Sequence, residues 1–149
     1  MDKSKKIIIA GAGIGGLAAA ACLLQEGYNV RVYETAPKLG EIGAGIQTSA
    51  NAVKVLHHLG LADQMAAVSV KPKSFEFRLF DSGEVLHKVP LAEAHEKAHG
   101  APYYHIHRSD IHQILADRVL ELDPDAVVLN STAIGFDETD DSVTLNLSD

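Results

Sequence analysis

Cysteine and tryptophan are nearly absent from this sequence of 149 residues, which contains one cysteine and no tryptophan. Because the single thiol, Cys22, has no partner in the chain, no intrachain disulfide can hold the fold together. A chain of this length buries roughly 68–70% of the surface that its unfolded form exposes, so its core needs neither a disulfide nor a structural metal. The shortage of cysteine fits a reducing compartment, and we expect a cytoplasmic protein.

Basic residues are scarce as well: 13 Lys and Arg face 20 Asp and Glu, for a net charge of −7. Residues 75–149 carry 5 basic and 15 acidic side chains, whereas residues 1–74 carry 8 basic and 5 acidic ones. Proteins that bind nucleic acid present clustered positive charge, so no nucleic-acid partner is expected. The mildly basic first half is compatible with an anionic ligand.

One long uncharged run, residues 7–24, follows three lysines and has the composition of a signal peptide or a marginal membrane span. Four glycines in the middle of the run argue against both, because each glycine costs a helix roughly 1 kcal/mol relative to alanine. A buried strand, a glycine turn and a helix explain the run better. We therefore expect no membrane span.

The strand at residues 7–10 and the helix through residues 17–24 are followed by Gly27 and a second strand at 29–34. A strand, a helix and a strand within about 30 residues form a βαβ unit with parallel strands and a right-handed crossover. The expected fold class is α/β, a Rossmann-like βαβ unit with a parallel sheet plus β-hairpins.

The rest of the chain alternates turns, helices and strands. Residues 35–47 are rich in turn formers, and a helix capped by Thr48 or Ser49 extends to Gly60. The other expected elements are a hairpin of 75–81 and 84–89, a polar stretch at 90–102, a strand at 103–108, a helix at 110–122, a strand at 126–129 and a hairpin of 133–136 and 143–147.

A glycine motif of the form G-x-G-x-x-G joins the first strand to the first helix. In this context the first glycine permits a tight turn, the second lets the backbone approach a pyrophosphate, and the third allows the helix to pack on the strand. Free N–H groups and the helix dipole favour the two phosphate charges. The predicted phosphate-binding residues are Gly11, Ala12, Gly13, Ile14, Gly15 and Gly16.

Glu34 closes the second strand 18 residues after Gly16, near the spacing at which an acidic residue binds a ribose 2′-hydroxyl. Together the strands, the helix, the glycines and this carboxylate predict a dinucleotide-binding site. The alternatives are glycines that serve only a tight turn and a Glu34 that is a surface carboxylate. The motif does not choose between NAD and FAD, because the folds that bind them share it.

Three segments together resemble the group A flavoprotein aromatic hydroxylases, in the branch of salicylate hydroxylase and 3-hydroxybenzoate 6-hydroxylase. They are the glycine motif, residues 40–47 (GEIGAGIQ) running on through 49–52 (SANA), and residues 107–111 (HRSDI). The resemblance covers nearly the whole chain. It implies an FAD-dependent monooxygenase that hydroxylates a salicylate-like or hydroxybenzoate-like acid with NAD(P)H as co-substrate and O₂.

The resemblance also implies further FAD contacts. A loop of Gly45, Ile46 and Gln47 would lie along the isoalloxazine and the ribityl chain, because glycine lets a flat ring approach the backbone closely. The Arg108 guanidinium would reach the ribityl-phosphate region, unless it is simply a surface arginine before a helix. The backbone near Ala133 would border the adenine. Thr35 follows Glu34 where the family often has a basic residue, so contacts on the adenine side are expected to differ.

No residue of the chain can be assigned as a catalytic acid or base. Two later motifs of the family, an Asp-Gly and a Gly-Asp segment, are not found, so residues 1–149 are interpreted as the N-terminal part of an FAD-binding domain, inactive alone. The hairpin at 75–89 is a candidate for the start of the substrate-domain sheet. The resemblance leaves open a homodimer for the full-length protein.

Two other classes of function compete with this interpretation. One is a stand-alone dinucleotide-binding module without oxygenase activity, and the other is an NAD-dependent oxidoreductase domain, against which the GAGIQ segment speaks. A metal site is not expected, because His105 and His107 share one side of a strand while His112 lies in the next helix and no cysteine or carboxylate completes a set.

Overall fold

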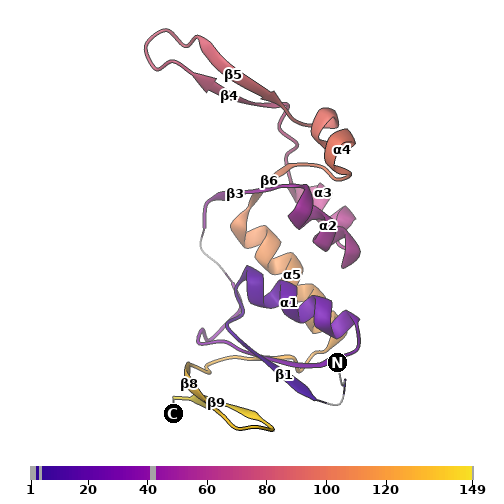
Figure 1. Ribbon diagram of the computed structural model, residues 1–149, viewed down its shortest axis with the longest axis vertical. Helices are drawn as coiled ribbons and strands as arrows, with labels where there is room; N and C mark the ends of the chain where they lie inside the picture. Colours follow the sequence, from indigo (N-terminus) through magenta and orange to yellow (C-terminus); the bar gives the residue numbers. More distant parts are fainter. Residues whose placement is uncertain (1–2, 4, 41–42, 149) are drawn as a thin grey trace. The chain divides into compact units, whose positions relative to one another are not determined.

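The computed structural model describes residues 3, 5–40 and 43–148, so Glu41 and Ile42 of the GEIGAGIQ segment lie outside the described residues. The chain forms two compact units (Figure 1). The first contains Met1–Ile42 and Ile111–Asp149, and the second contains Gly43–Asp110. Helix α5 (Arg108–Leu122) begins in the second unit and continues into the first.

A parallel sheet with the strand order β1, β2, β7 forms the base of the first unit. The central strand β2 (Asn29–Tyr33) pairs with β1 (Lys6–Ala10) along its whole length and with the short β7 (Val127–Val128) at its carboxyl end. Isoleucine and valine fill these strands because β-branched side chains pack well on a pleated surface. The structure confirms the predicted βαβ unit and the strand near residues 126–129.

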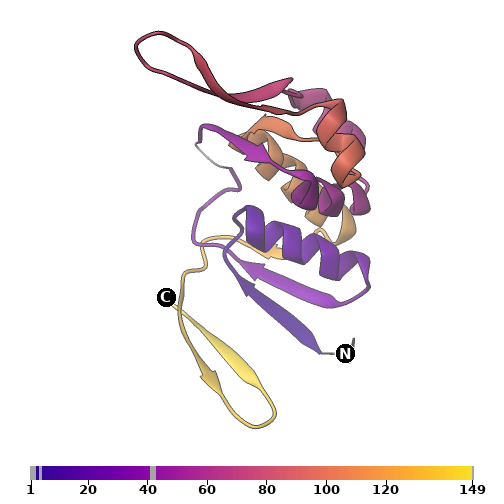
Figure 2. The same cartoon turned by 45° about the horizontal axis from the view of Figure 1, so that its top comes forward.

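Helices α1 (Ile14–Gln25) and α5 cover the same face of this sheet (Figures 1 and 2). Two right-handed crossovers that lead from β1 to β2 and on to β7 place both helices on one side. Small residues of α1 allow a close approach to β2. The core of the unit consists of fully or nearly fully buried side chains: Leu17, Ala20, Ala21, Val30, Val32, Ile111, Leu115, Ala116, Val119 and Ala126.

The first unit ends in an antiparallel hairpin of β8 (Ala133–Glu138) and β9 (Val143–Leu147), which confirms the hairpin predicted near the carboxyl end. Its strands carry exposed large apolar side chains, among them Ile134, Phe136 and Val143. A register shift between Ala133 and Gly135 bends the first strand of the hairpin.

The second unit is built around the antiparallel pair β3 (Gly45–Thr48) and β6 (Tyr104–His107). Helix α2 (Ala50–His58) follows β3, and a second hairpin extends from the unit (Figure 1). The other elements are α3 (Ala62–Val68), β4 (Ser74–Arg78), β5 (Val85–Pro90) and α4 (Glu93–His99). The core consists of Val53, Leu56, Leu59, Leu61, Met65, Tyr104 and Ile106.

The structure differs from the expectations for the second unit in four places. Gly45, Ile46 and Gln47 form strand β3 instead of a loop, because β6, some 60 residues later, supplies the hydrogen-bonding partners. The polar stretch 90–102 contains α4, which has no buried side chain and so shows no apolar periodicity. Helix α5 begins at Arg108 rather than near residue 110. Helix α3 lies in a segment for which no element was predicted.

Two observations bear on the uncharged run at residues 7–24. Within the described ranges, no helix has both the length and the apolar character needed to cross a bilayer. Cys22 lies on α1, where burial first and the nearby Glu26 second raise the pKa of the thiol. A raised pKa disfavours the thiolate, so Cys22 acts as a small apolar residue of the helix.

Candidate functional site

The glycine motif forms a tight turn between β1 and α1. Gly11 has a φ of +97°, a left-handed conformation that glycine adopts without steric cost. Its N–H donates to the carbonyl oxygen of Tyr33 at 2.7 Å, which extends the pairing of β1 with β2 by one residue. Gly13 is the N-cap residue of α1 and caps the helix without a side chain. The first N–H groups of the helix are therefore available to a ligand.

Gly16 is required by packing. A Cβ atom at this position would lie 2.0 Å from the carbonyl oxygen of Gly11 and 3.4 Å from Cγ2 of Ile9. The helix therefore approaches the preceding turn more closely than any side chain allows. Gly15 differs, because a Cβ atom there would meet no atom within 4 Å. Packing within the described chain thus explains why residue 16 is glycine but not why residue 15 is glycine.

Glu34 follows β2 directly, and its carboxylate binds the glycine turn. Oε2 accepts a hydrogen bond from the Ala12 N–H at 2.6 Å, and Oε1 accepts one from the Ala36 N–H at 2.9 Å. These bonds, first from Ala36 and then from Ala12, lower the pKa of Glu34 below its ordinary value of 4.5. The carboxylate is therefore ionised at neutral pH and fixed at the carboxyl end of the sheet.

His112 is a member of this site that the sequence did not reveal. The side chain is 2% exposed, and its Nε2 forms a hydrogen bond of 2.8 Å with the carbonyl oxygen of Ala12. The sequence suggested only a third histidine after His105 and His107, unsuited to a metal. The available signal was a polar residue among the buried positions of α5, next to Ile111 and near Leu115. That signal does not indicate which group the histidine contacts.

A small cavity of about 110 Å³ lies where these groups meet. The volume suits a sugar hydroxyl with its nearest atoms or a few water molecules. The Glu34 carboxylate offers acceptors there, and the Lys38 ammonium offers a positive charge. The cavity is lined by Ala12, Gly13, Glu34, Ala36, Lys38, Leu39, Gly40 and His112.

The segment before Ala133 runs beside the end of β2. The Ser131 N–H donates to the Glu34 carbonyl oxygen at 2.8 Å, and the Asn130 N–H donates to the Ala36 carbonyl oxygen at 3.2 Å. Asn130 has a φ of +53°, which asparagine tolerates better than most residues. Thr35 and Ala133 are both exposed and therefore accessible to a ligand.

The second unit holds the other predicted contacts. Gly45, Ile46 and Gln47 pair with His107, Ile106 and His105 of β6, respectively. A Cβ atom at Gly45 would meet only the carbonyl oxygen of Ile106, at 3.9 Å, so packing does not require glycine there. The structure therefore gathers the glycine motif, Glu34, Thr35 and Ala133 in the first unit, and Gly45, Ile46, Gln47 and Arg108 in the second.

Arg108 begins α5, and the base of its side chain packs against Gly43. The Arg108 N–H donates to the carbonyl oxygen of Ala44 at 3.2 Å. A Cβ atom at Gly43 would lie 2.9 Å from Cβ and 3.0 Å from Cδ of Arg108. The absence of a side chain at Gly43 thus sets the direction in which the arginine leaves the helix.

Gly43→Ala is expected to lower the free energy of unfolding by about 1–3 kcal/mol, because the added methyl group overpacks the Arg108 side chain. Urea denaturation of the two proteins measures the difference. Gly45→Ala is the matched control, since its methyl group has room, and it should change stability by about 0.5 kcal/mol or less. Equal losses in the two variants would contradict the packing of Arg108 on Gly43.

Histidines are frequent in the second unit, yet they do not assemble a metal site in the part of the chain described. No group of three or more His, Cys, Asp or Glu residues is arranged there to hold a metal ion. Several imidazoles instead contact other rings in tilted or edge-on arrangements. His95 lies 4.4 Å from His99 and 5.4 Å from Tyr103, and Tyr103 lies 5.8 Å from His105, all between ring centroids.

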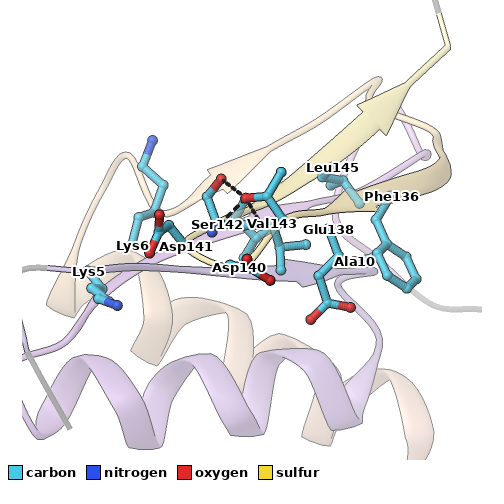
Figure 3. Close-up of a pocket in the computed structure, with 12 residues that line it drawn as sticks. Lys5, Lys6, Ala10, Phe136, Glu138, Asp140, Asp141, Ser142, Val143 and Leu145 are labelled. Atoms are coloured by element: carbon cyan, nitrogen blue, oxygen red, sulfur yellow. Dashed lines mark hydrogen bonds between the residues drawn. The ribbon is translucent and has the colours of Figure 1, made fainter.

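A larger groove of about 820 Å³ lies between β1 and the β8–β9 hairpin (Figure 3). Ile8, Phe136 and Leu145 supply apolar lining, whereas Lys6 and Asp141 stand among the charged residues at its edge. Parallel strands that read as continuous apolar runs are usually covered on both faces. Here Ile8 of β1 is 37% exposed, and the groove lies along the face of β1 that carries Ile8.

Comparisons with known proteins find relatives of this chain among enzymes. Residues 9–62 match the family of NAD(P)-binding Rossmann-like domains. The whole chain is 41% identical over 149 residues to 3-amino-4-hydroxybenzoate 2-monooxygenase of Streptomyces cremeus, of which it covers 37%. It is 34% identical over 139 residues, or 93% of its length, to 3-hydroxybenzoate 6-hydroxylase of Polaromonas naphthalenivorans (strain CJ2), of which it covers 35%.

The fold has a close counterpart among solved structures. The crystal structure of Klebsiella pneumoniae HpxO complexed with FAD and uric acid superposes with a TM-score of 0.82 at 30% sequence identity, over 99% of this chain and 36% of that one. The chain thus spans about a third of the length of the relatives it matches. Over that length its sequence and fold are similar to those of the N-terminal part of the FAD-dependent aromatic hydroxylases.

Proposed function

We propose that this chain is the FAD-binding N-terminal part of a monooxygenase that hydroxylates an aromatic acid of the hydroxybenzoate type, with NAD(P)H and O₂ as co-substrates. The observation that carries the proposal is the identity of 41% along the entire chain to a hydroxybenzoate monooxygenase. Because the chain spans only about a third of such enzymes, the activity is proposed for the whole protein.

The geometry of the first unit fits the pyrophosphate and the adenosine of FAD. The N–H groups at the start of α1 and the positive end of its dipole would bind the phosphates. The Glu34 carboxylate, at the end of β2, would accept a hydrogen bond from a ribose hydroxyl through a lone pair that the backbone leaves unused. The open space above Gly15, which packing does not explain, is where the phosphates would lie.

The second unit fits the flavin end of the same cofactor. A flat ring that lies against β3 needs one position without a side chain, which gives a reason for Gly45 that packing does not supply. The Arg108 guanidinium, directed by Gly43, would donate hydrogen bonds to oxygens of the ribityl-phosphate chain. The roles of Ile46, Gln47, Thr35 and Ala133 are proposed on the same basis, as backbone contacts to the ring and the adenine.

FAD supplies the redox chemistry when bound, since it takes electrons from the nicotinamide and passes them to O₂. The described residues bind and orient the cofactor. We assign no residue of this chain a proton-transfer role.

Purification of the whole protein, of which this chain is proposed to form the N-terminal part, and analysis of its released ligand test the proposal. We expect a yellow protein that releases FAD and oxidises NADH or NADPH faster when a hydroxybenzoate is added, with hydroxylated product formed. A colourless protein that binds NADH but not FAD would support an NAD-dependent oxidoreductase domain instead. Bound FAD with no aromatic acid that stimulates turnover would support a binding module without oxygenase activity.

Three further expectations remain proposals. The β4–β5 hairpin is proposed to begin the substrate-domain sheet, which is supported by the exposed rings of Phe75 and Phe77 on one of its faces. A cytoplasmic location is supported by the single free cysteine. A homodimer of the full-length protein is proposed from the family resemblance alone. Limited proteolysis, fractionation and analytical ultracentrifugation, respectively, test them.

A further inference from the structure

We propose that His112 is a positioning residue that sets the orientation of the glycine turn and thereby the affinity for the dinucleotide. The inference rests on the proposed function, because it names a residue that prepares the FAD site. His112 lies 100 positions after Ala12 in the sequence, yet its imidazole reaches the turn at 2.8 Å. No phosphate or sugar needs to touch it for this role.

The hydrogen bond fixes the tautomer of His112. A carbonyl oxygen only accepts, so Nε2 must carry the proton that it donates to Ala12. Nδ1 is buried and has no hydrogen-bond partner among the described residues. A protonated Nδ1 would therefore be a buried donor with nothing to bond, whereas the neutral ring leaves only an unused acceptor. The neutral Nε2–H tautomer is the form that this environment accommodates best.

His112 and Glu34 bind the two polar backbone groups of the same residue, Ala12. The Ala12 N–H donates to Glu34, and the Ala12 carbonyl oxygen accepts from His112. Because a trans peptide unit is planar, with its C=O and N–H pointing in opposite directions, fixing the Ala12 carbonyl also fixes the following N–H, that of Gly13. The Gly13 N–H then points away from His112, at the start of α1 where the phosphates are proposed to bind.

The anchor on which His112 is mounted is rigid. Leu115 and Ala116 follow it on α5 and are completely buried in the core of the first unit. Any change in the direction of the Ala12 carbonyl would thus have to break the hydrogen bond or move a packed helix. A binding loop held in this manner pays less ordering entropy when the ligand arrives, which raises affinity without a new contact.

Three variants of the whole protein test this role by titration with FAD, followed through flavin fluorescence. His112→Leu removes the donor and keeps an apolar side chain in the core, and we expect FAD affinity to fall about tenfold. His112→Gln, whose side-chain amide places a donor close to the position of Nε2, should recover most of that loss. Val119→Ala, on the same helix but away from the turn, controls for destabilisation of α5 and should leave affinity within about threefold.

Equal FAD affinity of the wild type and His112→Leu, or a failure of His112→Gln to recover affinity while it folds normally, would overturn the role. If the leucine variant does not fold, a measurement on the wild type without ligand tests the contact between His112 and Ala12. ¹⁵N NMR of the imidazole is expected to show a proton on Nε2 and none on Nδ1, and a proton on Nδ1 alone would contradict the proposal. If the wild type binds no FAD at all, the proposed function fails, while the NMR result still tests the contact with Ala12.

Discussion

Gly16→Ala is expected to cost the protein about 3 kcal/mol of stability or more, and to abolish FAD binding with it. The added Cβ would lie 2.0 Å from the carbonyl oxygen of Gly11. The obstacle is backbone, so no side-chain rotation relieves it, and α1 must move away from β1. Because α1 supplies Leu17, Ala20 and Ala21 to the core, the displacement also opens the packing of the first unit. Urea denaturation and thermal melting measure the loss.

Gly15→Ala is the matched control, one residue earlier in the same helix. Its methyl group meets nothing within 4 Å, and alanine favours a helix over glycine by up to about 1 kcal/mol. We therefore expect the protein without ligand to gain stability, while FAD affinity falls because the methyl group occupies the space assigned to the phosphates. Similar losses of stability in both variants would refute the close contact at Gly16. If Gly15→Ala leaves the FAD affinity unchanged, the phosphates do not bind in the space above Gly15.

Glu34→Gln is expected to lower FAD affinity at least tenfold and stability by about 1.5–3 kcal/mol. The carboxylate accepts hydrogen bonds from two backbone N–H groups, and bonds to a charged acceptor are worth about that much each. A glutamine keeps one acceptor oxygen and turns a donor toward the other N–H. Fluorescence titration with FAD and urea denaturation measure the two effects separately.

The stability difference depends on pH in a direction that the pKa fixes. The pKa of Glu34 is lowered in the folded protein, so folding gains stability from the carboxylate above its ordinary value of 4.5. That contribution disappears as the pH falls through the lower, folded pKa. Glu34→Gln therefore loses less stability than the wild type as the pH falls from neutral through the lowered, folded pKa of Glu34. Parallel pH profiles of the two proteins would show that the hydrogen bonds to Ala12 and Ala36 do not stabilise the fold.

Loop support and ribose binding by Glu34 can be separated with an FAD analogue whose adenosine ribose lacks the 2′-hydroxyl. The wild type should bind the analogue more weakly than FAD, because the carboxylate loses a partner. The difference in affinity between FAD and the analogue should be smaller for Glu34→Gln than for the wild type. If the wild type binds both equally, the carboxylate acts on the glycine turn alone, through Ala12.

Local patterns account for what the sequence predicted well. The apolar run at residues 7–10, the glycines after it and the strand that ends before Glu34 each depend on nearby backbone geometry, so the βαβ unit and its motif follow from residue types and spacing. Alternating residues around Ser82-Gly83 predicted the β4–β5 hairpin for the same reason, since its strands meet across a turn.

Contacts between distant segments could not be read in this way. Gly45, Ile46 and Gln47 form a strand only because β6 lies beside them, and a glycine-rich stretch has no strand pattern of its own. Likewise, α4 buries no side chain and α3 buries only Met65, so neither shows the periodicity that marks a helix.

By itself the sequence determined the glycine turn, the parallel βαβ unit and the carboxylate at its end, because φ preferences and the alternation of side chains act over a few residues. The tertiary structure alone decided which groups hold that turn. Glu34 bonds the Ala12 N–H and His112 bonds the Ala12 carbonyl across 22 and 100 positions of chain. Such pairs arise when packed elements bring a buried donor and a buried acceptor together, since neither can remain unpaired at low cost.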